Sequence, residues 1–147
     1  MHGVSMGAAT VLMASGEDLP ENVKAVIADC GYTSEWDEFQ READTLHIPW
    51  FPVLNATSVL SKIRDGYDFK QASALAQVKK SRIPTLFIHG SSDELVPYSM
   101  LGELYAAAAC EKEELTVEGA GHALSSSVAP TLYWRTVEDF IAKYLDR

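Results

Sequence analysis

Three residues far apart in the sequence carry side chains that could act together in nucleophilic catalysis. Ser5 lies in a Gly-x-Ser-x-Gly motif at residues 3–7, Asp93 follows an apolar run, and His122 follows a Gly-Ala-Gly stretch. A serine hydroxyl is a poor nucleophile until an imidazole removes its proton, and a buried carboxylate holds that imidazole in one tautomer. These residue types suggest Ser5 as nucleophile, His122 as base and Asp93 as acid.

The motif around Ser5 is typical of an elbow between a strand and a helix, which exposes the serine hydroxyl. Gly3 and Gly7 would let the turn form and let neighbouring backbone approach closely. The backbone N–H of Met6, directly after the serine, would face the negative oxygen that develops on an attacked carbonyl group. Because so few residues precede Ser5, we expect the strand before the elbow to be a stub.

The elements that would position these residues alternate between helices and strands. We expect strands at 23–29, 83–89 and 114–118, and helices at 8–15, from Ser34, at 55–64, at 71–80, from Pro97 and through residues 133–145. Such alternation predicts an α/β fold, a parallel sheet flanked by helices, with about three complete strands plus the elbow. Ligands of such sheets bind beyond the carboxyl ends of the strands, where Ser5, Asp93 and His122 are all expected.

Three segments resemble those of α/β-hydrolases: His-Gly-Val-Ser-Met-Gly-Ala at 2–8, Pro-Thr-Leu-Phe-Ile-His-Gly at 84–90 with Asp93 and Val96-Pro97, and Gly-Ala-Gly-His at 119–122. The chain order Ser, Asp, His is also the order of this fold. The whole sequence resembles the carboxyl-terminal part of a bacterial serine hydrolase of the serine aminopeptidase and esterase type. The resemblance implies one domain over residues 1–147, with Ser5, Asp93 and His122 in the roles given above.

The resemblance also implies an activity, the cleavage of a carboxylic ester, and less readily of an amide, through an acyl-enzyme. It places the early strands and the loop with a second oxyanion donor outside this sequence. The alternative is a catalytically inactive fragment, or an interaction module that needs strands from a partner chain. In either case Val23–Asp29 would form an apolar edge of the sheet, so we expect it to pair in a homo-oligomer or with another chain.

The segment 46–66 lies where the family that the sequence resembles inserts a lid. Two interpretations stand for the apolar residues that it contributes. In the first, Trp50, Phe51 and Leu54, together with Val96, line a pocket for an acyl or aromatic group. In the second, these residues simply pack the core.

Other residues with chemically active side chains have simpler interpretations. Glu94 adjoins Asp93 and is a rival for the role of the acid, although the resemblance places the acid at Asp93. His89 is interpreted as a structural residue at a strand end. Cys30 and Cys110 are too few for a disulfide framework and are expected to be packed thiols.

Composition narrows the partners that the chain is expected to bind. Its 147 residues include 12 Lys and Arg against 21 Asp and Glu, a formal net charge of −9, which argues against nucleic acid or an anionic membrane. No apolar run reaches the roughly 18 residues of a membrane span. No metal-ligand spacing or cofactor motif stands out, so we expect no cofactor, a small ester or amide as substrate, and a cytoplasmic location.

Overall fold

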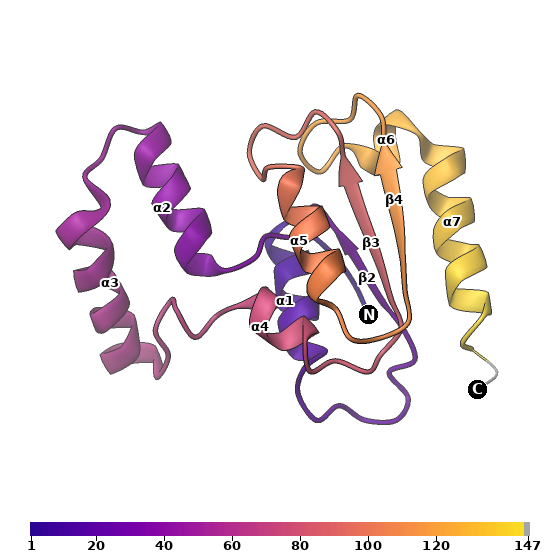
Figure 1. Cartoon of the computed structure of the whole chain (residues 1–147), viewed down its shortest axis with the longest axis horizontal. Coiled ribbons are helices and arrows are strands. Elements are labelled where there is room, and N and C mark those ends of the chain that lie inside the picture. Colours follow the sequence, from indigo (N-terminus) through magenta and orange to yellow (C-terminus); the bar gives the residue numbers. More distant parts are fainter. Residues whose placement is uncertain (146–147) are drawn as a thin grey trace.

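The computed structural model describes residues 1–145 and alternates strands and helices along the chain (Figure 1). Its elements are β1 (His2–Val4), α1 (Met6–Ala14), β2 (Val26–Asp29), α2 (Glu35–Thr45), α3 (Trp50–Asp65), α4 (Ala74–Val78), β3 (Thr85–Gly90), α5 (Ser99–Ala107), β4 (Lys112–Val117), α6 (Ser125–Val128) and α7 (Pro130–Ala142). The last predicted strand therefore begins earlier than expected, at Lys112. No helix among these residues is both long and apolar enough to cross a membrane.

The described strands form one parallel sheet in the order β1-β2-β3-β4. Ala28 of β2 lies opposite Gly3 on one side and Phe87 on the other, and Phe87 lies opposite Glu114 of β4. Every residue of β2 and β3 is buried, as expected for parallel strands that are covered on both faces. The expectation of a parallel sheet with flanking helices is confirmed.

Helices cover both faces of the sheet and bury a separate core on each (Figure 1). On one face α1, α4 and α5 pack on β2 and β3, with Leu12, Val78 and Leu104 against Phe87. On the opposite face α7 packs on β2, β3 and β4, and its inward side chains are Tyr133, Val137, Phe140 and, just beyond it, Tyr144. The three layers place the carboxyl ends of all the described strands at one rim.

The expectation that Val23–Asp29 forms an exposed edge of the sheet is wrong. The short strand β1 covers β2: Ile27 donates its backbone N–H to Met1 O over 2.8 Å. At the other end of β1, Ser5 donates its N–H to Asp29 O, also over 2.8 Å. Backbone bonds at both ends are enough to hold a three-residue strand in register, so the edge strand on this side is β1 and not β2.

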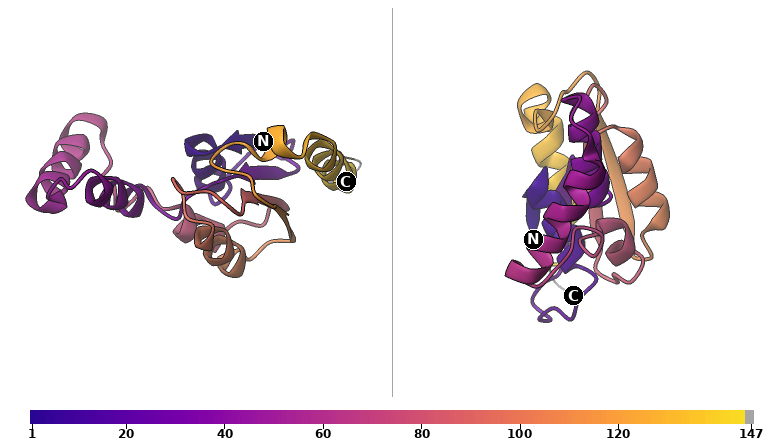
Figure 2. Two further views of the ribbon diagram at one scale, coloured as in Figure 1. Left: turned by 90° about the horizontal axis from the view of Figure 1, so that it is seen from above. Right: turned by 90° about the vertical axis from the view of Figure 1, so that its left-hand side faces the viewer.

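Helices α2 and α3 project away from the three layers (Figure 2). Ser34 caps α2 as predicted: its Oγ accepts from the N–H of Asp37 at 3.1 Å and donates to Asp37 Oδ2 at 2.6 Å. Phe51 has non-helical angles (φ −98°, ψ 129°) near the start of α3, as expected for a residue that precedes proline. The role of 46–66 as a lid stays a prediction.

Candidate active site

The backbone at Ser5 makes the sharp turn that the motif predicts. Ser5 has φ 55° and ψ −120°, a conformation that L residues rarely adopt and that costs about 1–3 kcal/mol. The turn brings β1 against α1 so closely that a Cβ on Gly3 would lie 2.1 Å from Gly7 O. A Cβ on Gly7 would meet no atom within 4 Å, so only Gly3 is required for close approach.

The loops after β3 and β4 bring Asp93 and His122 to Ser5. Ser5 Oγ lies 2.7 Å from His122 Nε2, and His122 Nδ1 lies 2.9 Å from Asp93 Oδ2. An ionised carboxylate only accepts hydrogen bonds, so it favours the tautomer in which Nδ1 carries the proton. In that tautomer Nε2 is free to accept the proton of the Ser5 hydroxyl.

Asp93 rather than Glu94 faces the imidazole. The Asp93 side chain is 0% exposed, and its Oδ1 accepts backbone N–H bonds from Leu95 at 3.0 Å and Val96 at 2.9 Å. Glu94 points outward and is exposed. The turn that contains these amides therefore holds the Asp93 carboxylate toward His122, while the Glu94 side chain lies in solvent.

The first turn of α1 supplies a hydrogen-bond donor beside the Ser5 hydroxyl. Met6 is the first residue of α1, and amides of the first helical turn have no acceptor within their own helix. The positive end of the helix dipole reinforces such a donor toward negative charge.

Two further residues with strained backbone surround this point. Cys30 has φ 49° at the end of β2 and Ala123 has φ 57° directly after His122. The Cys30 thiol and the ligand atoms of Asp93 and His122 lie within 4.8 Å of one another, the one group of three potential metal ligands this close among the described residues. Burial, and next the charge of Asp29, raise the pKa of Cys30 to about 12, so the thiol stays protonated and packs as an apolar group.

A second buried carboxylate, which sequence reasoning missed, lies behind the nucleophile. Asp29 is 1% exposed and its Oδ1 accepts a 3.0 Å hydrogen bond from Ser125 Oγ. The Tyr133 hydroxyl also bonds Asp29, and His2 Nε2 lies 2.9 Å from that hydroxyl. Burial raises the pKa of Asp29 against these bonds. In the sequence, the one sign of this buried carboxylate is the position of Asp29, an acid at the end of an otherwise apolar run.

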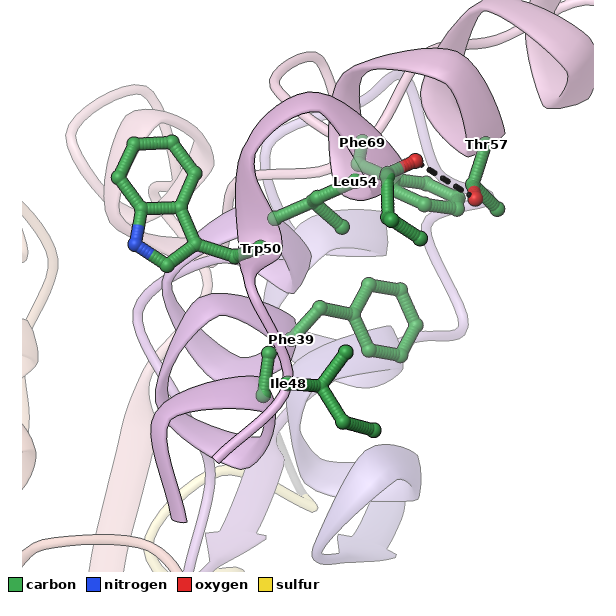
Figure 3. A pocket seen from close by; sticks show the side chains of 8 residues that line it. Phe39, Ile48, Trp50, Leu54, Thr57 and Phe69 are labelled. Carbon is green, nitrogen blue, oxygen red and sulfur yellow. Dashed lines mark hydrogen bonds between the residues drawn. The ribbon is translucent and has the colours of Figure 1, made fainter. Parts of the chain in front are cut away.

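An apolar pocket of about 210 Å³ lies between α2 and α3 (Figure 3). It is lined by Phe39, Ala43, Ile48, Trp50, Val53, Leu54, Thr57 and Phe69. Two of the residues expected in a pocket, Trp50 and Leu54, are therefore here, but Phe51 is 66% exposed outside it. Val96 was also expected to line a pocket and does not, because it is 1% exposed in a core cluster with Ala9.

Helix α2 also carries a partly buried acid, Glu38. Burial raises the pKa of Glu38 in α2, whereas a 3.0 Å ion pair with Arg41 and the charge of His122 lower it. Helix α2 begins at Glu35, five residues after Cys30, whose thiol lies within 4.8 Å of the side-chain ligand atoms of Asp93 and His122. The start of α2 therefore follows closely in sequence from the rim where Ser5 lies.

The parallel sheet, the elbow at Ser5 and the order Ser, Asp, His after β1, β3 and β4 define an α/β-hydrolase fold. The chain belongs to the prolyl oligopeptidase family, whose sequence model matches residues 1–147. It is 32% identical over 144 residues to the uncharacterised protein YqkD of Bacillus subtilis, covering 96% of this chain and 47% of YqkD. The chain thus spans about half the length of that relative.

Solved structures show the same fold. The esterase Pf2001 of Pyrococcus furiosus superposes with a TM-score of 0.70 at 18% identity, over 98% of this chain and 53% of the esterase. An acylaminoacyl peptidase of Pyrococcus horikoshii superposes with a TM-score of 0.73 at 18% identity, over 100% of this chain and 24% of the peptidase. The expected membership of the α/β-hydrolase superfamily is confirmed.

Proposed function

We propose that this chain carries the catalytic centre of a serine hydrolase that cleaves carboxylic esters, and less readily amides. The observation that supports this most is the pair of hydrogen bonds that links Ser5 Oγ to His122 Nε2 and His122 Nδ1 to Asp93 Oδ2 within one chain. The family and its esterase and peptidase structural relatives agree with a hydrolase.

The geometry supports a two-step reaction. Ser5 Oγ attacks the substrate carbonyl carbon while His122 Nε2 takes its proton, and the Met6 N–H stabilises the oxyanion. The leaving alcohol receives that proton from Nε2, which leaves an acyl group on Oγ. Water then attacks the acyl carbon, gives a proton to Nε2, and releases the carboxylic acid as Oγ regains its proton.

The pocket between α2 and α3 is the proposed site for an apolar acyl or aromatic group of the substrate. Its lining includes Phe39, Leu54 and Phe69, so it would accept groups without charge. The short connection from Cys30, beside Asp93 and His122, to the start of α2 supports this assignment, because a substrate bound along α2 would have one end directed toward the triad.

Substitution tests whether Asp93 or its neighbour Glu94 is the acid of the proposed mechanism. We expect Asp93→Asn to lower kcat for p-nitrophenyl acetate by about 10⁴-fold, because an amide cannot hold the reactive tautomer of the imidazole. Glu94→Gln is the matched control, since the Glu94 side chain is exposed, and its kcat should stay within about twofold. A large loss in Glu94→Gln with little loss in Asp93→Asn would reverse the assignment of the acid.

A further inference from the structure

His89, the second histidine beside Asp93, takes no part in the proton transfers described above. It lies in β3 and is 1% exposed, so it is as deeply buried as the carboxylate itself. Its Nε2 lies 3.0 Å from Val96 O and 3.3 Å from Asp93 Oδ2. A carbonyl oxygen only accepts hydrogen bonds, so His89 Nε2 must carry a proton and donate it toward both oxygens.

We propose that His89 is a positioning residue that fixes the Asp93 carboxylate for its bond to His122. The inference rests on the proposed function, in which Asp93 orients the imidazole. With His89 included, Asp93 receives N–H donors at both oxygens: Leu95 and Val96 at Oδ1, and His122 and His89 at Oδ2. A carboxylate held in this way cannot turn about its own axis, so Oδ2 stays directed at His122 Nδ1.

The same N–H also ties the loop that carries Asp93 back to the sheet. The bond from His89 to Val96 O joins the end of β3 to the far side of the turn, three residues past Asp93. The Tyr98 ring packs edge-on against the imidazole, with 5.9 Å between ring centres and 86° between planes, and so limits the rotation of His89. Removal of this donor would release both the carboxylate and the loop.

Three variants of the full chain separate the hydrogen bond from packing. His89→Gln places an amide N–H near the position of Nε2, His89→Leu fills the space without a donor, and His89→Asn is polar but too short. We expect kcat for p-nitrophenyl acetate to fall about 10- to 100-fold in the Leu and Asn variants, with KM unchanged, and to recover in the Gln variant. Unchanged kcat in His89→Leu, or an equal loss in all three folded variants, would overturn the proposal.

Proton NMR in a Ser5→Ala background needs no turnover and so separates this proposal from the proposed hydrolysis. The low-field resonance of the His122 Nδ1–H, assigned by its absence in His122→Ala, reports the bond to Asp93. We expect this resonance to move upfield or broaden in His89→Leu and to return in His89→Gln, with unchanged near-ultraviolet circular dichroism. An unmoved resonance in His89→Leu overturns the positioning role. A responsive resonance supports that role, and if the chain with Ser5 intact shows no esterase activity, the proposed function is overturned while the positioning role stands.

Discussion

Ser5 holds a backbone conformation that the surrounding chain has to enforce. Its φ of 55° is unfavourable for a residue with a side chain, and Cys30 and Ala123, which lie beside it, also have positive φ. Strained residues of this kind persist where neighbouring structure fixes them, and they concentrate at functional sites. Here the N–H bond from Ser5 to Asp29 O and the contact of Gly3 with Gly7 provide that constraint.

The two glycines of the motif should respond very differently to alanine. Gly3→Ala would place a methyl group 2.1 Å from Gly7 O, so we expect it to destabilise the chain by about 3 kcal/mol or more. Gly7→Ala faces open space within α1 and should instead stabilise it by about 0.5–1 kcal/mol. Urea denaturation of both variants measures the difference, and equal effects would show that the elbow is not packed as described.

At the residue scale, the sequence predicted that Ser5, Asp93 and His122 would lie together, but not what surrounds them. Ser5, Asp93 and His122 could be predicted together because parallel strands bring their carboxyl ends to one rim, wherever the residues stand in the sequence. The bond from His89 to Asp93 depends instead on how one turn folds back, and nothing in the residue types reveals that path. The prediction that Val96 lines a pocket was wrong, because the sequence alone does not show whether a single apolar residue faces a pocket or the core.

Among the elements, β1 and the pair α2 and α3 matter most for the site. The strand β1 has only three residues, yet it sets the position of Ser5 because its register with β2 is fixed at both ends. Helices α2 and α3 lie outside the three layers, and Phe39 of α2 packs against Phe69 of the loop after α3, with ring centres 4.8 Å apart. These helices can therefore vary in sequence without disturbing the sheet.

The pocket between α2 and α3 predicts a dependence on acyl length. Thr57→Leu adds bulk at the pocket, so we expect kcat/KM for p-nitrophenyl octanoate to fall several-fold relative to the acetate ester. Thr45→Leu is the matched control, because Thr45 is also an exposed helical threonine bonded to the carbonyl four residues earlier but lies outside the pocket. An identical ratio of the two esters in both variants would mean that the pocket only packs the helices.

Element types were predictable where hydrophobic periodicity was strong, as for β3 and α7. The cap at Ser34 was predictable for a local reason, since a serine three residues before an acid bonds the first helical turn. The pairing of β1 with β2 was not, because a three-residue strand carries no periodic pattern of its own. That omission led to the wrong expectation of an exposed edge at Val23–Asp29.

At the scale of the whole molecule, one buried acid joins α6 and α7 to the elbow at Ser5. Asp29 ends β2, bonds Ser125 of α6 and Tyr133 of α7, and through its backbone holds Ser5. Its burial places a titratable group inside the fold, and the pKa of that group is raised above the unfolded value of 3.8. The stability of the molecule should therefore depend on pH through this residue.

Asp29→Asn tests that dependence. Because the folded state binds the Asp29 proton more tightly, this residue contributes most stability below about pH 4 and loses it as pH rises through the raised pKa. The free energy of unfolding of Asp29→Asn minus that of the parent chain should therefore increase from pH 4 toward neutrality. Urea denaturation at several pH values measures this difference, and a flat or falling difference would contradict the raised pKa. Contributions from Glu35 and Glu38, whose pKa values burial also raises, cancel in the comparison.

The assembly of a reactive nucleophile within these 147 residues is the central claim, and a fluorophosphonate probe tests it most directly. The probe forms a phosphonate ester with an activated serine Oγ and releases fluoride. Intact-protein mass spectrometry detects the mass that the phosphonate adds to the chain. The hydrogen bond of 2.7 Å from Ser5 Oγ to His122 Nε2 predicts a single adduct on the parent chain and none on Ser5→Ala. A folded parent chain without adduct, or equal labelling of Ser5→Ala, would contradict the account.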